Sequence, residues 1–108
     1  MATPTDDDRS LVTVIAHMKA LPGKEQDLRE LLESLVDPTL AEDGNVNYDL
    51  HVAEDDPGRF FFYENWTGGD KLDAHLGAPH LQGALGRLDE FLEGGAGGLV
   101  ITRVKRIK

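Results

Sequence analysis

The chain contains no cysteine, so disulfide bonds, thiolate nucleophiles and cysteine-based zinc sites are excluded. Its unbroken apolar stretches are only a few residues long, far below the ~20 residues that a membrane-spanning helix requires. It also lacks a positively charged start followed by an apolar segment, which is the pattern of a secretory leader. We therefore expect a cytoplasmic protein that makes no contact with a membrane.

Basic residues are scarce as well. Eleven Lys and Arg stand against twenty Asp and Glu, which gives a formal net charge of −9. This charge would repel a phosphate backbone unless the bases were clustered, and the one basic cluster, in the segment TRVKRIK, alternates with apolar residues as a strand does. No glycine-rich phosphate loop joins a strand to a helix, because the glycines at 94–98 lead into a predicted strand. No nucleic-acid partner is expected.

The length of 108 residues accommodates a single domain. Residues 1–10 are polar and acidic, and we predict that they form a disordered tail. The periodic hydrophobic pattern begins at residue 11, so residues 11–108 are predicted to form the folded domain.

Alternating apolar residues predict four strands, at residues 11–20, 46–52, 59–66 and 99–107. Residues 55–58 carry a strong turn signal, which predicts a hairpin between the second and third strands. The glycine-rich run at 94–98 is predicted to have no regular structure.

Helical spacing predicts a helix over residues 24–41 and a second helical region that begins at Asp70. Pro38 removes a backbone hydrogen bond, so a kink or early end is expected near Asp37. Pro79 is expected to divide the second helical region into two pieces.

The order strand, helix, strand, strand, helix, strand predicts an α+β fold of the ferredoxin-like βαββαβ type, with a four-stranded antiparallel sheet and both helices on one face. The first, third and fourth strands carry apolar residues on both sides, and soluble monomers rarely expose a large apolar sheet face. A second copy of the chain is the simplest cover. We therefore predict a homodimer whose sheets pack face to face, with a small-molecule cavity between sheet and helices.

Four stretches resemble the antibiotic biosynthesis monooxygenase family, and within it the quinol monooxygenase branch: VTVIAHMKALPGK, EDGNVNYDLHV, YENW and KLDAHLGAPHLQ. The resemblance extends over nearly all of Leu11 to Ile107. Its most specific feature is Glu-x-Trp followed nine residues later by a helical histidine and then by Pro-His. This pattern is specific for the fold family and poor at separating the reactions of its members.

The resemblance implies a dimeric α/β barrel that oxidises a small aromatic, phenolic or quinol substrate with O2 and uses no flavin, haem or metal. A deprotonated phenol or quinol is electron-rich enough to pass an electron to O2, so the protein needs only a base, a dry cavity and donors for the oxyanion. Histidine suits the role of base, because its ordinary pKa of about 6.5 lets it accept a proton near neutral pH.

Three candidate catalytic residues follow from the resemblance. His75 matches the family's helical histidine and is the candidate base; the alternative is a hydrogen-bonded packing residue. Trp66 would form a flat wall for an aromatic substrate, or would belong to the core. Glu64 shares the strand face of Trp66 and would orient His75 or a substrate hydroxyl, or would be a solvated or salt-bridged acid.

The candidate substrate-binding residues are His17, Tyr48, Phe62 and His80. In haem-degrading relatives a polar residue at the position of His17 lines the cavity; a dimer-interface or solvent position is the alternative. Tyr48 matches a family tyrosine that would donate to a substrate oxygen, and plain packing is its alternative. Phe62 belongs to a run of three phenylalanines that places aromatic rings on both faces of the sheet.

No metal site is expected, because His75 and His80 are five residues apart across a proline, His51 lies on a polar strand face, and no spacing presents three ligands on one surface. Haem degradation is disfavoured, since relatives with that activity carry an axial histidine later in the second helical region and no histidine follows His80. The alternative to an oxygenase is a non-oxygenase small-molecule-binding dimer, or an isomerase or cleavage enzyme on the same scaffold.

Overall fold

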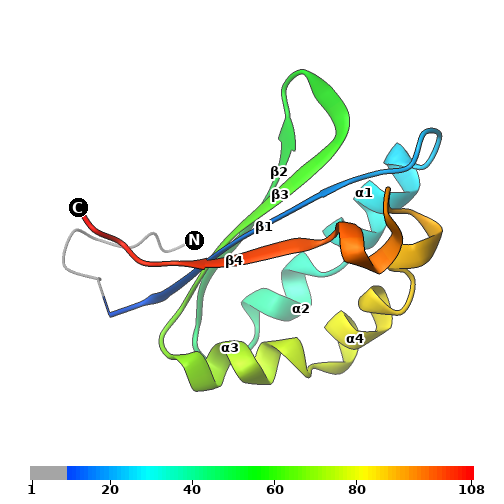
Figure 1. Cartoon of the computed structure of the whole chain (residues 1–108). Coiled ribbons are helices and arrows are strands. Elements are labelled where there is room, and N and C mark those ends of the chain that lie inside the picture. Colours follow the sequence, from blue (N-terminus) through cyan, green and yellow to red (C-terminus); the bar gives the residue numbers. More distant parts are fainter. Residues whose placement is uncertain (1–9) are drawn as a thin grey trace.

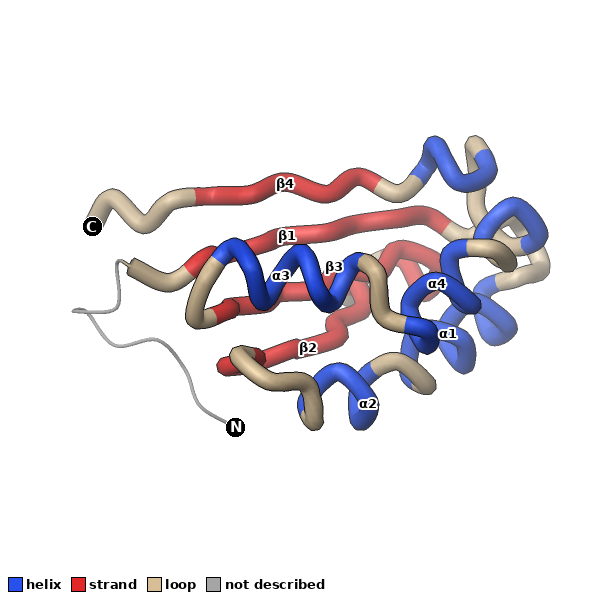
Figure 2. Tube along the Cα trace, turned by 90° about the horizontal axis from the view of Figure 1, so that it is seen from below, coloured by secondary structure: helices blue, strands red, loops and turns tan. Residues whose placement is uncertain are grey.

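A computed structural model describes residues 10–108, so the predicted disorder of residues 1–10 falls almost wholly outside the described part of the chain. Four antiparallel strands form one sheet in the order β2-β3-β1-β4, and the helices cover one of its faces (Figures 1 and 2). The strands are β1 (Val12–Lys19), β2 (Asn45–Ala53), β3 (Asp56–Trp66) and β4 (Val100–Val104). This arrangement confirms the predicted ferredoxin-like α+β fold.

The helical layer consists of α1 (Glu25–Glu33), α2 (Val36–Leu40), α3 (Gly69–Leu76) and α4 (Pro79–Leu85). As predicted, Pro79 separates two helices, and it occupies the first position of α4, where its missing N–H costs no helical hydrogen bond. Two short 3₁₀ turns follow, at Leu88–Glu90 and Gly95–Gly98. The glycine-rich run is therefore more regular than predicted, with Gly94 and Gly95 in the left-handed region that favours glycine.

The break in the first helical region comes one turn earlier than the predicted position near Asp37. The helix α1 ends at Glu33, and α2 begins at Val36. Pro38 has no N–H to offer the carbonyl of Ser34, four residues earlier, and its ring crowds that carbonyl. The helical hydrogen bonding is therefore interrupted at Ser34, while Pro38 itself lies in the first turn of α2, where it is tolerated.

The hairpin turn also differs from the prediction. The turn is formed by Glu54 and Asp55, and β3 already begins at Asp56. Val52 pairs with Phe60 and Ala53 pairs with Asp56, so the residues between Asp56 and Phe60 bulge out of the β2–β3 ladder. Pro57 has no N–H to donate to the strand ladder, so it fits the bulge. The proline that contributed to the turn prediction therefore lies in a bulge instead.

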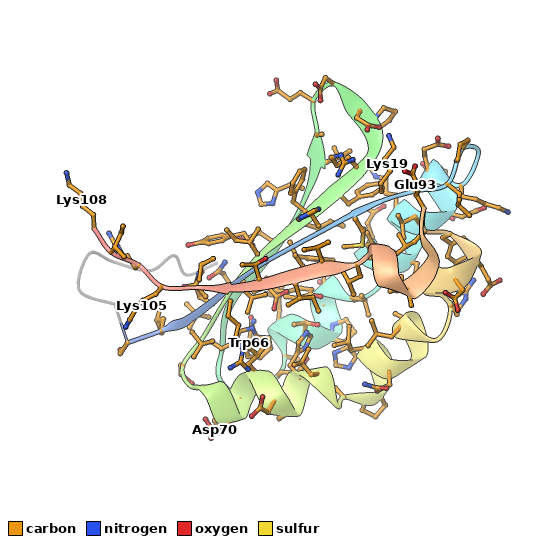
Figure 3. All side chains as sticks on the ribbon, in the orientation of Figure 1. Lys19, Trp66, Asp70, Glu93, Lys105 and Lys108 are labelled. Carbon is orange, nitrogen blue, oxygen red and sulfur yellow. The ribbon has the colours of Figure 1, made fainter. Side chains whose placement is uncertain are left out.

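The face of the sheet that the helices cover holds the core. Along β1, Val14, Ala16 and Met18 are buried on this face, and Ala16 and Met18 pack with apolar residues of α1, α4 and β3. Trp66 at the end of β3 is fully buried and packs with Val14 and Leu72 in a second, smaller cluster. Figure 3 shows Trp66 in the space between the sheet and α3. No helix within residues 10–108 is long and apolar enough to cross a membrane.

The other face of the sheet, here called the open face, carries no helix. By strand register, odd-numbered residues of β1 and their partners on β3 and β4 point to this side. It exposes 36–42% of four large apolar side chains, Ile15, Tyr63, Val100 and Val104. An apolar, helix-free face is what the sequence predicted.

Candidate active site

A cavity of about 80 Å³ lies between the covered face of the sheet and the helices α3 and α4. Its wall is almost entirely apolar, and Leu99, Ile101 and Arg103 on and beside β4 form one side of it. A single water molecule needs about 10–15 Å³ of such space, so the cavity has room for several non-hydrogen atoms of a small ligand. The polar side chains that reach it are Tyr48, Glu64, His75 and Arg103.

Glu64 and Trp66 project from β3 to the covered face of the sheet, two residues apart as strand alternation requires. Glu64 lines the cavity, whereas Trp66 is a fully buried core residue outside the lining. The indole Nε1–H of Trp66 donates a hydrogen bond of 3.0 Å to Oε1 of Glu64. Only 5% of Glu64 is exposed. Burial raises the pKa of the Glu64 carboxyl to about 7, against the opposing effect of the Trp66 hydrogen bond and with a smaller contribution from the charge of Glu42. Near neutral pH this carboxyl is therefore neutral in about half of the molecules.

His75 lies in the last turn of α3 and is buried. Its Nδ1 lies 2.7 Å from Oε2 of Glu42, and its ring packs against the rings of Trp66 and Tyr48 at centroid distances of 4.7 and 5.4 Å. Among residues 10–108, Nε2 of His75 has no hydrogen-bond partner. When the neutral imidazole donates its Nδ1–H to Glu42, the lone pair is on Nε2. The arrangement thus gives a cavity-lining histidine a free basic nitrogen.

Glu42 is the site residue that the sequence did not reveal. It lies in the turn between α2 and β2, where the sequence pattern indicated only a chain reversal. The same oxygen, Oε2, lies 2.9 Å from Nε2 of His80, which in turn lies 3.3 Å from Oγ1 of the buried Thr39. One carboxylate oxygen therefore binds both imidazoles that flank Pro79.

The expectation that no three possible metal ligands share a surface was wrong. The donor atoms of Glu42, His75 and His80 all lie within 4.8 Å of one another. The expectation rested on the spacing of histidines along one part of the chain, whereas the third ligand comes from a turn more than thirty residues earlier. Only the tertiary fold brings it to the two histidines.

Tyr48 and Phe62 line the cavity from β2 and β3, and their rings stack at a centroid distance of 4.5 Å. Burial raises the pKa of the Tyr48 hydroxyl far above its ordinary value, and the nearby Glu64 charge acts in the same direction. Tyr48 therefore remains a neutral hydroxyl that is able to donate a hydrogen bond.

His17 does not join this group. It pairs with Phe61 across β1 and β3, and its ring lies 6.0 Å from that of Phe61 on the open face. Strand alternation turns it away from the buried Ala16 and Met18, which line the cavity. The fold therefore places His17 outside the cavity of its own chain, which agrees with the alternative of a dimer-interface or solvent position.

The family model described as antibiotic biosynthesis monooxygenase matches residues 11–87. The chain is 36% identical over 83 residues to "Putative monooxygenase Rv0793" of Mycobacterium tuberculosis, which covers 77% of this chain and 81% of that protein. The chain is also 28% identical over 82 residues to "Putative monooxygenase YcnE" of Bacillus subtilis. This match covers 76% of this chain and 86% of YcnE.

Solved structures agree with the sequence matches. The structure of Rv0793 superposes with a TM-score of 0.82 at 31% identity, covering 92% of this chain and 97% of that chain. PA3566 from Pseudomonas aeruginosa superposes with a TM-score of 0.82 at 30% identity, covering 92% of this chain and 96% of that one. The chain belongs to the antibiotic biosynthesis monooxygenase family. This membership supports a monooxygenase-type function that acts on a small molecule.

Proposed function

We propose that the chain is a cofactor-independent monooxygenase that oxidises a small phenolic or quinol substrate with O2. The observation that carries the proposal is His75: its Nδ1 is held by Glu42 at 2.7 Å, and its Nε2 has no partner among residues 10–108 at the wall of an apolar cavity. A base so held is oriented before the substrate arrives, which lowers the cost of reaching the reactive geometry.

In the proposed reaction His75 Nε2 accepts the proton of a substrate hydroxyl, and the resulting anion passes an electron to O2. For a quinol, the balanced outcome is a hydroxyquinone and water: one oxygen atom enters the ring and the other leaves as water. The four electrons that O2 accepts come from the substrate itself, so no external reductant is required. Tyr48 donates to the substrate oxygen, and Glu64 in its neutral form supplies a proton to the reduced oxygen.

Homodimerisation is the second part of the proposal. Ile15, Tyr63, Val100 and Val104 expose 36–42% of their surface on the open face, where no helix of the described chain covers them. A second sheet packed on this face would bury these side chains, as in the ordinary packing of two sheets. The cavity lies on the opposite side, so each chain would keep its own site.

A proton-transferring isomerase is the second candidate, and one observation favours it. Glu64 and His75 are two titratable groups on the wall of the same apolar cavity. A pair of this kind can remove a proton from one carbon of a bound substrate and return it to a neighbouring one. Such a reaction would need no O2.

The test is oxygen uptake with a panel of benzoquinols and naphthoquinols, corrected for autoxidation. We expect His75→Ala to lower the rate by about 10²–10⁴-fold, the ordinary contribution of a general base. The matched control is His51→Ala, because His51 is exposed on β2 and its ring nitrogen contacts only the backbone carbonyl of Asp49 among the described residues. Equal rates for native protein and His75→Ala would remove His75 from the mechanism. Substrate conversion without O2 would favour the isomerase.

A further inference from the structure

We propose that Glu42, His75 and His80 form a binding site for one borderline divalent metal ion of the zinc class, and that occupancy of this site switches off His75 as a base. The second half of this inference rests on the proposed function; the first half does not. The site reuses the cluster that positions His75 in the metal-free protein.

The donor set fits that class of ion. Two imidazole nitrogens and one carboxylate oxygen are ligands shared by zinc, cobalt, nickel and ferrous iron, whereas calcium and magnesium prefer oxygen ligands alone. All three donor atoms lie within 4.8 Å of one another. The three side chains come from the turn before β2, the end of α3 and the start of α4, so regular elements on either side of Pro79 hold both histidines.

The distances allow an ion to enter with a small movement. At bond lengths of about 2.0–2.2 Å, two ligand atoms of a tetrahedral ion lie about 3.4 Å apart. Oε2 of Glu42 now lies 2.7 Å from Nδ1 of His75 and 2.9 Å from Nε2 of His80. Each pair therefore has to open by less than about 1 Å. Water or Oγ1 of Thr39, 3.3 Å from the His80 nitrogen, is available as a further ligand.

An ion can reach the cluster without crossing the apolar cavity. The side chains of Glu42 and His80 are 17% and 24% exposed, whereas that of His75 is 3% exposed. The carboxylate and the outer imidazole thus face water while the inner imidazole faces the cavity. A hydrated cation would meet Glu42 and His80 first and then His75.

Coordination would change the tautomer of His75. Without an ion, a neutral His75 ring that donates its Nδ1–H to Glu42 has its lone pair on Nε2. A metal ion on Nδ1 needs the lone pair there, so the single proton of the neutral ring moves through solvent to Nε2. The nitrogen that is free to act as a base then becomes a donor and can no longer accept a proton from a substrate.

The test starts with tag-free full-length protein, stripped with chelator and titrated with Co²⁺ and Zn²⁺ by calorimetry and by the visible absorption of Co²⁺. We expect one ion for each chain and at least a tenfold weaker affinity in both Glu42→Gln and His80→Gln. The control His51→Gln removes an exposed histidine outside the cluster and should keep the native affinity. Thermal unfolding of each variant without metal shows whether it still folds.

The inference is overturned if the native chain binds neither ion more tightly than Glu42→Gln and His80→Gln do, or if His51→Gln loses as much affinity as they lose. For the switching half, Zn²⁺ should lower oxygen uptake by native protein at least tenfold, and chelator should restore it. Zinc binding without a loss of oxygen uptake would refute the switch, and the proposal of a metal site would stand. Metal binding by a native protein that consumes no O2 with any quinol supports the site and refutes the proposed function.

Discussion

Replacing Glu64 by Gln tests whether burial keeps this carboxyl neutral up to about pH 7. Gln has nearly the same shape and retains an oxygen that can accept the hydrogen bond of Trp66 Nε1. It does not titrate. The difference between native protein and the variant therefore isolates the cost of ionising a carboxyl that is only 5% exposed.

The sign follows from the raised pKa. Folding raises the pKa of Glu64 from the ordinary value of 4.5 to about 7, so the native chain holds this proton more tightly than the unfolded chain. The resulting stability is fully present below about pH 4.5 and is lost as the pH rises to about 7. At about 1.4 kcal/mol for each pH unit, the whole loss is about 3 kcal/mol. Native protein should be less stable than Glu64→Gln by about 1 kcal/mol at about pH 5 and by about 3 kcal/mol at about pH 8.

The assay is urea unfolding followed by circular dichroism at those two pH values, with chelator present and with equal protein concentrations, because the stability of the proposed dimer would depend on concentration. Any other titrating group contributes equally to both proteins and cancels in the difference. A gap of the same size at both pH values would mean that Glu64 is ionised throughout, and the reasoning from burial would be refuted.

Two further predictions concern the packing around the site and the open face. Trp66→Phe removes the donor to Glu64 and leaves a void at a fully buried position. The free energy of unfolding should therefore fall by about 2–4 kcal/mol in the same urea assay. A loss below about 0.5 kcal/mol would contradict the packing described for Trp66. Ile15→Lys places a charge in the centre of the open face and should shift sedimentation from dimer toward monomer. The control Ile107→Lys changes a position that is 90% exposed and should leave sedimentation unchanged. An unchanged dimer in Ile15→Lys would contradict the proposed interface.

The sequence was sufficient for the strands and for their two faces. Period-two alternation depends only on local backbone geometry, so it correctly placed Glu64 and Trp66 on the same side of β3. It also identified apolar residues on both faces of β1, which is why the helix-free surface could be predicted from the sequence alone.

Proline and glycine signals were less informative about exact boundaries. Residues 55–58 predicted the turn, but the chain reverses at Glu54 and Asp55, and Pro57 lies in a bulge of β3. A β-turn and a β-bulge can both accommodate a proline, which has no N–H, and a glycine, whose backbone is permissive. Hydrogen-bonding partners from the neighbouring strands decide between them, and these are not visible in a local pattern.

Glu42 marks the point at which local patterns fail completely. Its neighbours, Glu-Asp-Gly, are those of any exposed turn, yet its carboxylate accepts from two histidines that follow more than thirty residues later. What identifies it is topology: β2 begins beside the end of β3, so the turn that precedes β2 lies next to α3, and from there the Glu42 carboxylate reaches His75 in the last turn of that helix. A search of turn carboxylates near a predicted helical histidine would have included it among several candidates.

The charges of the cavity explain how the proposed reaction could generate an anion in an apolar space. Proton transfer from a phenol to His75 creates a substrate anion and an imidazolium together, and Glu42 at 2.7 Å already offers the imidazolium a counter-charge. The substrate anion needs donors rather than another negative charge. Tyr48, whose raised pKa keeps its proton in place, the neutral form of Glu64 and the guanidinium of Arg103 are cavity groups able to donate. If Glu64 were ionised at all pH values, it would repel the anion that His75 produces, so the burial that destabilises the Glu64 carboxylate is the same feature that makes the base useful.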